Sequence, residues 1–325
     1  MDIKKYNRRN SGYSMLELMV VISVIVMLIG ILVPAIKGVK RIAKNLEQKS
    51  MFHALDIGLG LFKTDFGDYP ESKQENDPDL SSTLQYTGAQ HLAEAMVGRD
   101  DRGYEPSQNR KWNWPSEPAG GDLYFPDPAD DAKYTKSSNR RKDPYINLKE
   151  TGAFIMTELY DIPFAGDVVS EVEALGNGTS VPYRAPVLTD VFMTKTVDLD
   201  NGERIKVGSP ILYYKANSSS KLFKKEPEVG DGAAEFATWI YNYEDNRAII
   251  DAGPIDSDDP ADKHHYDESY IDISTSKDGV DIFYGNISDE NTSFDKPQNA
   301  MTYLLISAGS DGIFGTRDDV TNMKD

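Results

Sequence analysis

Three aspartates near the C-terminal end of the sequence have the type and spacing that suit a metal ion. Asp311, Asp318 and Asp319 fall within nine residues, interleaved with glycines at positions 309, 312 and 315. Ca²⁺ takes six to eight oxygen ligands from carboxylates and carbonyls, and glycine lets a backbone curl around an ion. The pattern predicts a calcium site. An Asp-Gly turn with solvent-facing acids explains it equally, and Arg317 inside the loop could neutralise the acids instead.

A second acidic stretch, residues 256–269, contains the adjacent pair His264 and His265. Histidine and carboxylate side chains are common metal ligands, so a metal site is conceivable here. Two adjacent histidines rarely point at one ion from a strand. A hydrated acidic loop is therefore the preferred interpretation of this stretch.

Enzymatic chemistry has little support in the sequence. It contains no nucleophile elbow, phosphate-binding loop, zinc-protease helix or dinucleotide fingerprint. Its four histidines leave little room for a catalytic triad, and the absence of cysteine excludes thiol nucleophiles, thiolate metal sites and disulfides. Acids are so numerous that some pair will lie close together by chance, so no glycosidase pair can be inferred. We predict that the protein is not an enzyme.

One carboxylate, Glu17, lies inside an apolar run that extends over residues 15–33. An acid in a membrane costs about 2.5–3.5 kcal/mol on insertion scales, so it should be matched by a partner. If the chain were cut between Gly12 and Tyr13, a new α-amine would lie one helical turn from Glu17. The carboxylate could pair with this amine or with that of a neighbouring subunit. The first turn of a helix also favours negative charge.

The element that carries Glu17 is long enough to cross a membrane. As a helix, residues 15–33 span about 28 Å, close to the roughly 30 Å of a hydrocarbon core. Lys4, Lys5, Arg8 and Arg9 precede the run and would hold this end in the cytoplasm. No second run of that length comes after it, so the remaining residues should form one body on the far side. A secretory signal cut before Ile36 and a plain anchor are the alternatives, and neither explains the acid.

Residues 8–36, RRNSGYSMLELMVVISVIVMLIGILVPAI, resemble the class III signal of type IV pilins and type II secretion pseudopilins. The resemblance implies that a prepilin peptidase cuts after Gly12 and methylates the new N-terminus, Tyr13, where phenylalanine is usual. It implies that Glu17 acts in assembly, and that the protein is a single-pass protein of the bacterial inner membrane with an extracytoplasmic body. Pro34 matches the place where the long helix of this family often bends, and predicts a break in the helix.

Charge and periodicity characterise the residues beyond the membrane run. Apolar residues at steps of three and four predict one helix over about 14–66, ended by Gly67 and Pro70. Residues 1–44 hold eight basic and two acidic residues, net +6, which leaves net −24 for residues 45–325. Such a body disfavours nucleic-acid binding. Four basic residues follow the apolar run: Lys37, Lys40, Arg41 and Lys44. They form either a solvated helix face or a surface that contacts the acidic bodies of neighbouring subunits.

The rest of the chain predicts an α+β body in which the second half of the long helix packs on an antiparallel sheet with large loop insertions. The expected division is a leader (1–12), a membrane half (13–34) and an amphipathic half (35–66) of the helix, and a globular domain (67–325).

Within that domain we expect an insertion at 99–148 that carries Trp112 and Trp114, whose rings either pack on the core or are exposed to contact a partner. Short helices are expected at 88–97, capped by Thr87 and ended by Gly98, and at 149–159. Strands are expected at 187–193, 195–199, 203–207, 211–216, 248–251, 270–274, 280–284 and 302–306, with a hairpin turn at Asn201-Gly202.

Two further segments are similar to the major pseudopilin of type II secretion. They are the Asp68-Tyr69-Pro70 segment after the helix and the loop LLISAGSDGIFGTRDDV, which in that family holds calcium. The resemblance implies a structural subunit of a pilus-like filament in protein secretion. Its partners would be a prepilin peptidase, other pilin-like subunits and an inner-membrane assembly platform. The alternatives are a type IV or minor pilin in adhesion, motility or uptake, a membrane-tethered carbohydrate-binding protein that uses the Trp-bearing insertion, and a tethered hydrolase.

Overall fold

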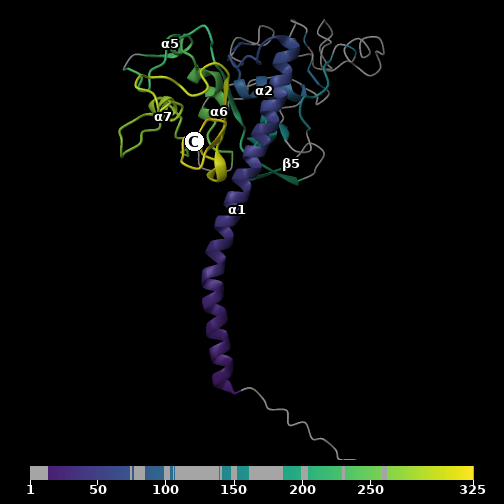
Figure 1. Ribbon diagram of the computed structural model, residues 1–325, viewed down its shortest axis with the longest axis vertical. Coiled ribbons are helices and arrows are strands. Elements are labelled where there is room, and N and C mark those ends of the chain that lie inside the picture. The colour runs from purple at the N-terminus through teal and green to yellow at the C-terminus, as the bar shows by residue number, and fades with distance from the viewer. Residues whose placement is uncertain are drawn as a thin grey trace, which may run out of the picture. The chain divides into compact units, whose positions relative to one another are not determined.

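The structure is a computed structural model of the 325-residue chain. The chain divides into two compact units, Met1–Lys44 and Asn45–Asp325. The residues that the structure describes are 14–73, 75–76, 85–98, 103–104, 106, 139, 141–147, 152–160, 186–198, 204–228, 231–255, 257 and 262–324. Figure 1 shows the order of the elements along the chain.

A single helix, α1, runs from Met15 to Phe66 without interruption (Figure 1). This confirms the predicted long helix but corrects one expectation, because the helix continues through Pro34. A proline removes one hydrogen bond from a helix interior, and the turns on both sides keep their helical form. The helix ends where Gly67 adopts a positive φ of 87°, a conformation that glycine reaches without steric cost.

The second unit is built around a three-stranded antiparallel sheet in the order β7-β8-β9. Its strands are β7 (Leu212–Lys215), β8 (Tyr303–Ser307) and β9 (Val320–Thr321). Leu212 pairs with Ile306, and Ser307 pairs with Val320. Successive side chains point to opposite faces of a strand, and both faces of β8 are buried. The sheet is therefore covered on both sides.

The second half of α1 covers one face of this sheet together with α2 (Gly88–Val97). A buried cluster joins Leu55, Leu59 and Phe62 of α1 to Leu92 and Met96 of α2 and to side chains of the sheet. Spacings of three and four residues place these α1 side chains on one stripe of the helix. The expectation that the long helix packs on an antiparallel sheet is confirmed.

Short helices cover the opposite face. They are α5 (Ala233–Phe236), η1 (Tyr243–Asn246), α6 (Arg247–Asp251) and α7 (Gly279–Asn286). Aromatic side chains of these helices and of the turn after α5 pack against one another. Between ring centroids, Trp239 lies 4.7 Å from Tyr284 in a tilted arrangement, and Tyr243 lies 5.6 Å from Phe283 edge-on. Such pairs add about 0.5–1.5 kcal/mol each beyond burial. This second layer was not expected from the sequence.

Local signals fixed several elements as predicted. Thr87 caps α2 in a reciprocal arrangement with Gln90, and Gly98 follows its last residue with a φ of 83°. A hairpin joins β5 (Lys195–Asp198) to β6 (Arg204–Val207), while its turn, including Asn201 and Gly202, lies outside the described residues. Two further antiparallel pairs are β1 (Glu75–Asn76) with β2 (Gln85–Tyr86), and β3 (Ala153–Ile155) with β4 (Pro186–Leu188).

Four expected elements were wrong. The predicted strands at 248–251 and 280–284 are the helices α6 and α7, and 270–274 forms turns with a single bridge at Ile271. The expected helix at 149–159 is a strand, β3, followed by one helical turn, α4 (Met156–Leu159). Most of the 99–148 insertion, including Trp112 and Trp114, lies outside the described residues.

Candidate functional site

The start of α1 is fixed by a capping box. The backbone N–H of Ser14 donates to Glu17 Oε2 at 2.8 Å, and the N–H of Glu17 donates to Ser14 Oγ at 3.2 Å. This exchange satisfies two backbone donors that a helix start otherwise leaves without a partner. Glu17 is thus held with its carboxylate toward the N-terminus. Gly12 and Tyr13, the predicted processing site, lie outside the described residues.

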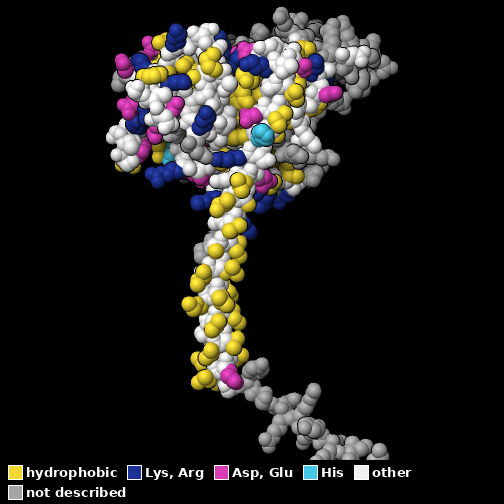
Figure 2. All heavy atoms as spheres, viewed as in Figure 1, with side chains coloured by type: hydrophobic (Ala, Val, Ile, Leu, Met, Phe, Trp, Pro, Cys, Tyr) yellow, Lys and Arg dark blue, Asp and Glu magenta, His cyan; other side chains and the backbone are white. Residues whose placement is uncertain are grey.

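The first half of α1 is apolar on all sides and unburied. This helix is long enough and apolar enough to cross a membrane, although a signal sequence can have the same length and composition. Leucine, isoleucine and valine side chains from Leu16 to Val33 are all exposed, and hydrophobic side chains crowd the visible surface of this segment (Figure 2). A helix that is hydrophobic all round needs an apolar environment. The basic residues Lys40 and Arg41 that come next are exposed.

The C-terminal loop is a tight turn held by its own carboxylates. Asp318 Oδ2 accepts hydrogen bonds from the N–H and the Oγ of Ser310, at 2.8 and 2.7 Å, and from the N–H of Asp311 at 3.1 Å. Gly309 has a φ of 69°, and a Cβ atom there would lie 2.2 Å from the carbonyl oxygen of Asp318. Only glycine fits this close approach, so one end of the loop is fixed by sequence.

The structure brings two of the three predicted aspartates, Asp311 and Asp318, to one hydroxyl group. The Thr316 hydroxyl lies 2.9 Å from Asp311 Oδ2 and 2.6 Å from Asp318 Oδ1. Burial, and then the neighbouring Asp318, raise the pKa of Asp311. Burial acts in the same direction on Asp318, but hydrogen bonds from Thr316 and Ser310 outweigh it and hold its pKa below the ordinary value. One carboxylate of this pair is therefore the stronger acid.

Asp319 is the most shielded of the three. Its Oδ2 accepts from the N–H of Gly315 at 2.9 Å, whereas its Oδ1 is buried and has no hydrogen-bond partner. Burial, opposed by the Gly315 hydrogen bond and assisted by the nearby Asp311 and Asp318, raises its pKa well above the ordinary value. An orphaned buried carboxylate oxygen is costly unless a cation or a proton compensates it.

Carboxylate oxygens are suitable calcium ligands, but in this loop they do not form a complete coordination site. Asp311 and Asp318 share the Thr316 hydroxyl, and Asp319 lies near both. Arg317 is exposed and makes no ion pair with any residue in the described part of the chain. No group of three or more acidic or histidine side chains among the described residues is arranged to hold an ion. Calcium binding would require Asp311 and Asp318 to exchange some loop hydrogen bonds for the ion, and it stays a prediction.

The sequence interpretation of the second acidic stretch was wrong in part. His264, Tyr266 and Asp267 are buried, and His264 Nδ1 accepts from the N–H of Phe314 at 3.0 Å. Burial lowers the pKa of His264 to about 3, so the ring is neutral and structural. Asp256, Asp258 and Asp259 lie outside the described residues. No sequence signal links His264 to a residue fifty positions away.

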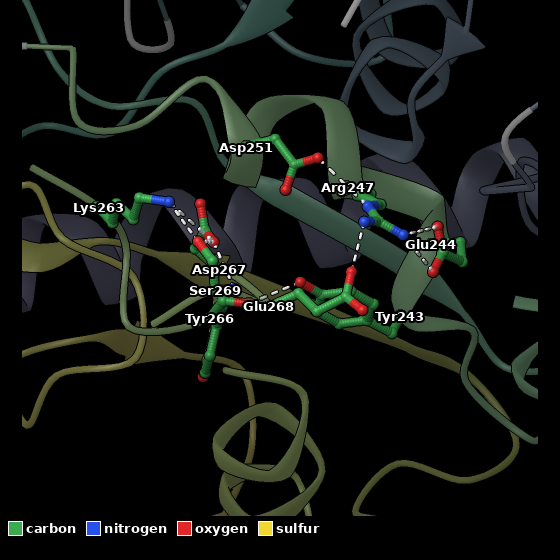
Figure 3. A network of polar contacts seen from close by, with 9 residues as sticks. All are labelled: Tyr243, Glu244, Arg247, Asp251, Lys263, Tyr266, Asp267, Glu268 and Ser269. Atoms are coloured by element: carbon green, nitrogen blue, oxygen red, sulfur yellow. Dashed lines mark hydrogen bonds and ion pairs between the residues drawn. The ribbon is translucent and has the colours of Figure 1, made fainter. Parts of the chain in front are cut away.

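A polar network fastens this stretch to α6, as Figure 3 shows. Arg247 contacts Glu244 and Asp251, each at 3.2 Å, and also Glu268. The Tyr243 hydroxyl donates to the carbonyl of Tyr266 at 2.6 Å. The network joins the end of this stretch to η1 and α6, which precede it. Its acids therefore position the chain that supports the C-terminal loop.

Comparison with known proteins identifies a family motif in the N-terminal segment. Residues 7–33, a range that includes Gly12, Tyr13 and Glu17, match the family model described as the prokaryotic N-terminal methylation motif. Over 70 residues the chain is 37% identical to type II secretion system core protein G of Aeromonas hydrophila. That similarity covers 22% of this chain and 49% of the relative, so the chain spans about half the length of the curated relative it matches. No solved structure matches. The motif is one of pilin-like structural proteins, which are not enzymes.

Proposed function

We propose that this chain, which carries the N-terminal methylation motif of pilin-like subunits, is a structural subunit of a pilus-like filament that acts in protein secretion. The observation that carries the proposal is the start of α1. A methylation motif covers residues 7–33, and within it a capped carboxylate precedes a helix that is apolar all round. Apolar helices of this kind can pack side by side in the core of an assembly after they leave the membrane.

Processing would complete the assembly end of the helix. In this proposal a prepilin peptidase cuts between Gly12 and Tyr13 and methylates Tyr13. The cut leaves Tyr13 directly before the cap residue Ser14, whose N–H already binds the Glu17 carboxylate. A new α-ammonium group would therefore form one residue before the N–H that binds this carboxylate. Charge attraction in an apolar environment is strong, so Glu17 would pair with the amine of its own chain or of an incoming subunit.

The same arrangement supports a location and a set of partners. The basic leader would stay in the cytoplasm, α1 would cross the inner membrane, and the acidic second unit would lie outside. Assembly would need other pilin-like subunits and a platform in the inner membrane. The calcium proposed for the C-terminal loop would act as a structural ion in the second unit.

The choice of secretion over a pilus rests on the relative. That relative is a core protein of type II secretion, and the similarity extends over 70 residues. A type IV or minor pilin is the remaining candidate from the same class. No described residue favours a carbohydrate-binding protein, because Trp112 and Trp114 lie outside the described residues.

Intact mass measurement of membrane-extracted protein tests the proposal. The expected product lacks residues 1–12 and carries one methyl group at Tyr13. Gly12→Leu should leave the leader in place, because a bulky residue at the cut blocks processing, while Gly38→Leu is a matched control that should be processed normally. A mature protein that begins at Ile36 would instead identify a secretory signal, and would end the proposal.

A further inference from the structure

The part of α1 that follows the membrane-length run is basic. Four residues carry the charge, at helix positions i, i+3, i+4 and i+7: Lys37, Lys40, Arg41 and Lys44. This spacing places residues on one side of a helix. The sequence has no acid between Glu17 and Glu47, so no carboxylate lies within one helical turn of Lys40 or Arg41 along α1. Ion pairs within the helix therefore do not neutralise these two residues.

Lys40 and Arg41 have no counter-ion in the described part of the chain. Both side chains are exposed, and neither makes an ion pair with any described residue. Figure 2 shows dark-blue basic side chains where the hydrophobic surface of α1 ends. Long aliphatic stems let the charged ends of such side chains extend along a helix. The pair is therefore available to an anion that another molecule supplies.

The same turns expose apolar side chains. Val39, Ile42 and Leu46 are 67%, 61% and 63% exposed, and their spacing of three and four residues places them on another face than the basic pair. A helix surrounded by water would bear polar residues at these positions. The segment therefore suits an environment that accepts apolar side chains and also supplies negative charge. A membrane surface provides both, because acyl chains and phosphate groups lie next to each other there.

Distance along the helix places the basic pair beside the headgroups. At 1.5 Å per residue, Lys40 and Arg41 lie about 10–12 Å beyond Val33, the last residue of the apolar run. The headgroup layer on each side of the roughly 30 Å hydrocarbon core is about 5–8 Å thick. Electrostatic attraction reaches about 8–10 Å further in physiological salt. A bilayer crossed by residues 15–33 therefore brings its phosphate groups within reach of both side chains.

We infer that Lys40 and Arg41 bind the headgroups of anionic phospholipids at the outer surface of the membrane that α1 crosses. The inference rests on the membrane location proposed above, but it requires no filament. Arginine binds phosphate through two parallel hydrogen bonds, and lysine adds a point charge. The acidic second unit of a neighbouring copy is the competing partner. The membrane is favoured because its surface adjoins these residues in every subunit before assembly.

The lipid selectivity of the full chain tests the inference. The chain is reconstituted into phosphatidylcholine vesicles that contain a trace of spin-labelled phosphatidylglycerol or spin-labelled phosphatidylcholine. Electron spin resonance then measures the fraction of each labelled lipid that the protein restricts. We expect phosphatidylglycerol to be preferred about two- to fivefold, because the attraction between one basic residue and an anionic membrane surface corresponds to about a fivefold change in binding. Raising the salt concentration should reduce the preference.

Matched variants assign the preference to these two residues. Lys40→Gln combined with Arg41→Gln should lower it about twofold or more. Arg41→Lys alone should lower it less than Arg41→Gln alone, because it keeps the charge and loses only the paired hydrogen bonds. Lys221→Gln combined with Lys296→Gln removes the same charge from exposed residues of the second unit and should keep the parental preference. The basic leader is present in every variant, so its own attraction for lipid cancels in the comparison. Circular dichroism checks that each variant is folded.

Four results would overturn the inference. The first is a parent chain without any preference for phosphatidylglycerol. The second is the parental preference in the variant that lacks both charges at positions 40 and 41, which would leave the neighbouring copy as the partner. The third is an equal loss in the second-unit control, which would identify general charge attraction. The fourth is loss of the preference in inorganic phosphate but not in chloride of the same ionic strength, which would identify a site for a free anion.

Flotation of the vesicles separates these results from a failure of the proposed function. A chain that does not float with the vesicles would contradict the proposed membrane location itself. A chain that floats without lipid selectivity would overturn only the inference about Lys40 and Arg41. None of these results bears on processing at Gly12, which intact mass measures separately.

Discussion

The two halves of α1 put the same residue types to opposite uses. Leu28, in the first half, is 61% exposed, whereas Leu59, in the second half, is fully buried. The difference arises from spacing, because apolar residues surround the first half but occupy one stripe of the second. The first half is thus prepared for an apolar environment that other molecules supply, and the second half finds its environment within its own unit.

Glycines show the same contrast. A Cβ atom at Gly30 or Gly38 would have no other atom within 4 Å, but one at Gly58 would lie 3.0 Å from Met96 Sδ and 3.1 Å from Ile146 Cγ2. Gly58 therefore lets α1 approach α2 closely. At position 58 of the second half glycine is a packing residue, although it lowers helix propensity by about 1 kcal/mol.

The largest effect should come from deleting a core side chain. Leu59→Ala should lower the free energy of unfolding of the second unit by about 2–5 kcal/mol, because it leaves a cavity under the sheet. Leu28→Ala removes the same atoms from the first half and should leave this quantity unchanged. Denaturant unfolding of the full chain in detergent, followed by tryptophan fluorescence, measures both. Equal losses in the two variants would contradict the contrast between the halves.

Calcium should have the next largest effect if it occupies the C-terminal loop. An ion that binds only the native state adds about 2.7 kcal/mol at a hundredfold excess over its Kd. The second unit should therefore melt at a higher temperature in calcium than in chelator. Asp318→Asn combined with Asp319→Asn should remove that difference.

Asp289→Asn combined with Asp295→Asn is the control for the calcium test, because it changes charge equally in another loop. An unchanged melting temperature across millimolar calcium would contradict calcium binding. The loop would then be a turn held by its own hydrogen bonds, and calcium would not stabilise the second unit.

A smaller effect separates two neighbouring glycines. Gly58→Val should lower the free energy of unfolding by about 1–3 kcal/mol because the side chain overpacks the contact with Met96 and Ile146. Gly60→Val has the same change in helix propensity but meets no atom within 4 Å at its Cβ. The difference between the two variants isolates the packing effect. A difference near zero would mean that α2 moves away at no cost.

The smallest effect on unfolding is expected at Glu17. Glu17→Ala should leave the unfolding of the second unit unchanged, yet filament yield should fall because an incoming α-amine loses its carboxylate. Glu17→Gln keeps an oxygen that can accept the Ser14 N–H, so it preserves the cap but removes the charge. Electron microscopy counts the filaments. Normal assembly of Glu17→Gln would show that capping suffices and would remove the charge pair from the mechanism.

Elements with a signal inside a few residues could be predicted from the sequence. Thr87 and Gly98 delimit α2 because a cap and a stop act through adjacent backbone groups. The long helix and the hairpin strands β5 and β6 are predicted by periodicity in the same way. The capping box at Ser14 and Glu17 carries an equally local signature, although the sequence interpretation pairs that acid with an α-amine and notes only that the first helical turn favours its charge.

Two kinds of feature could not be predicted. The apolar runs at 248–251 and 280–284 are too short to show a period, although Asp278, whose side chain accepts from Asp281 N–H, marks the start of α7. The second kind depends on contacts between distant segments. The hydrogen bond between His264 and Phe314 exists only once the chain is folded.

The pairing of early and late residues sets an order of events in synthesis. The Tyr303 hydroxyl donates to Asp56 Oδ1 at 2.7 Å across 247 positions, and β8 supplies the central strand on which the second half of α1 packs. Contacts this distant slow folding, because a long loop must close before they form. Leu55, Leu59 and Phe62 are only partly covered, by α2, until residues 303–320 have been made. A growing chain of this protein therefore presents part of an apolar helix stripe until residues 303–320 have been made, and until then that stripe is exposed to aggregation.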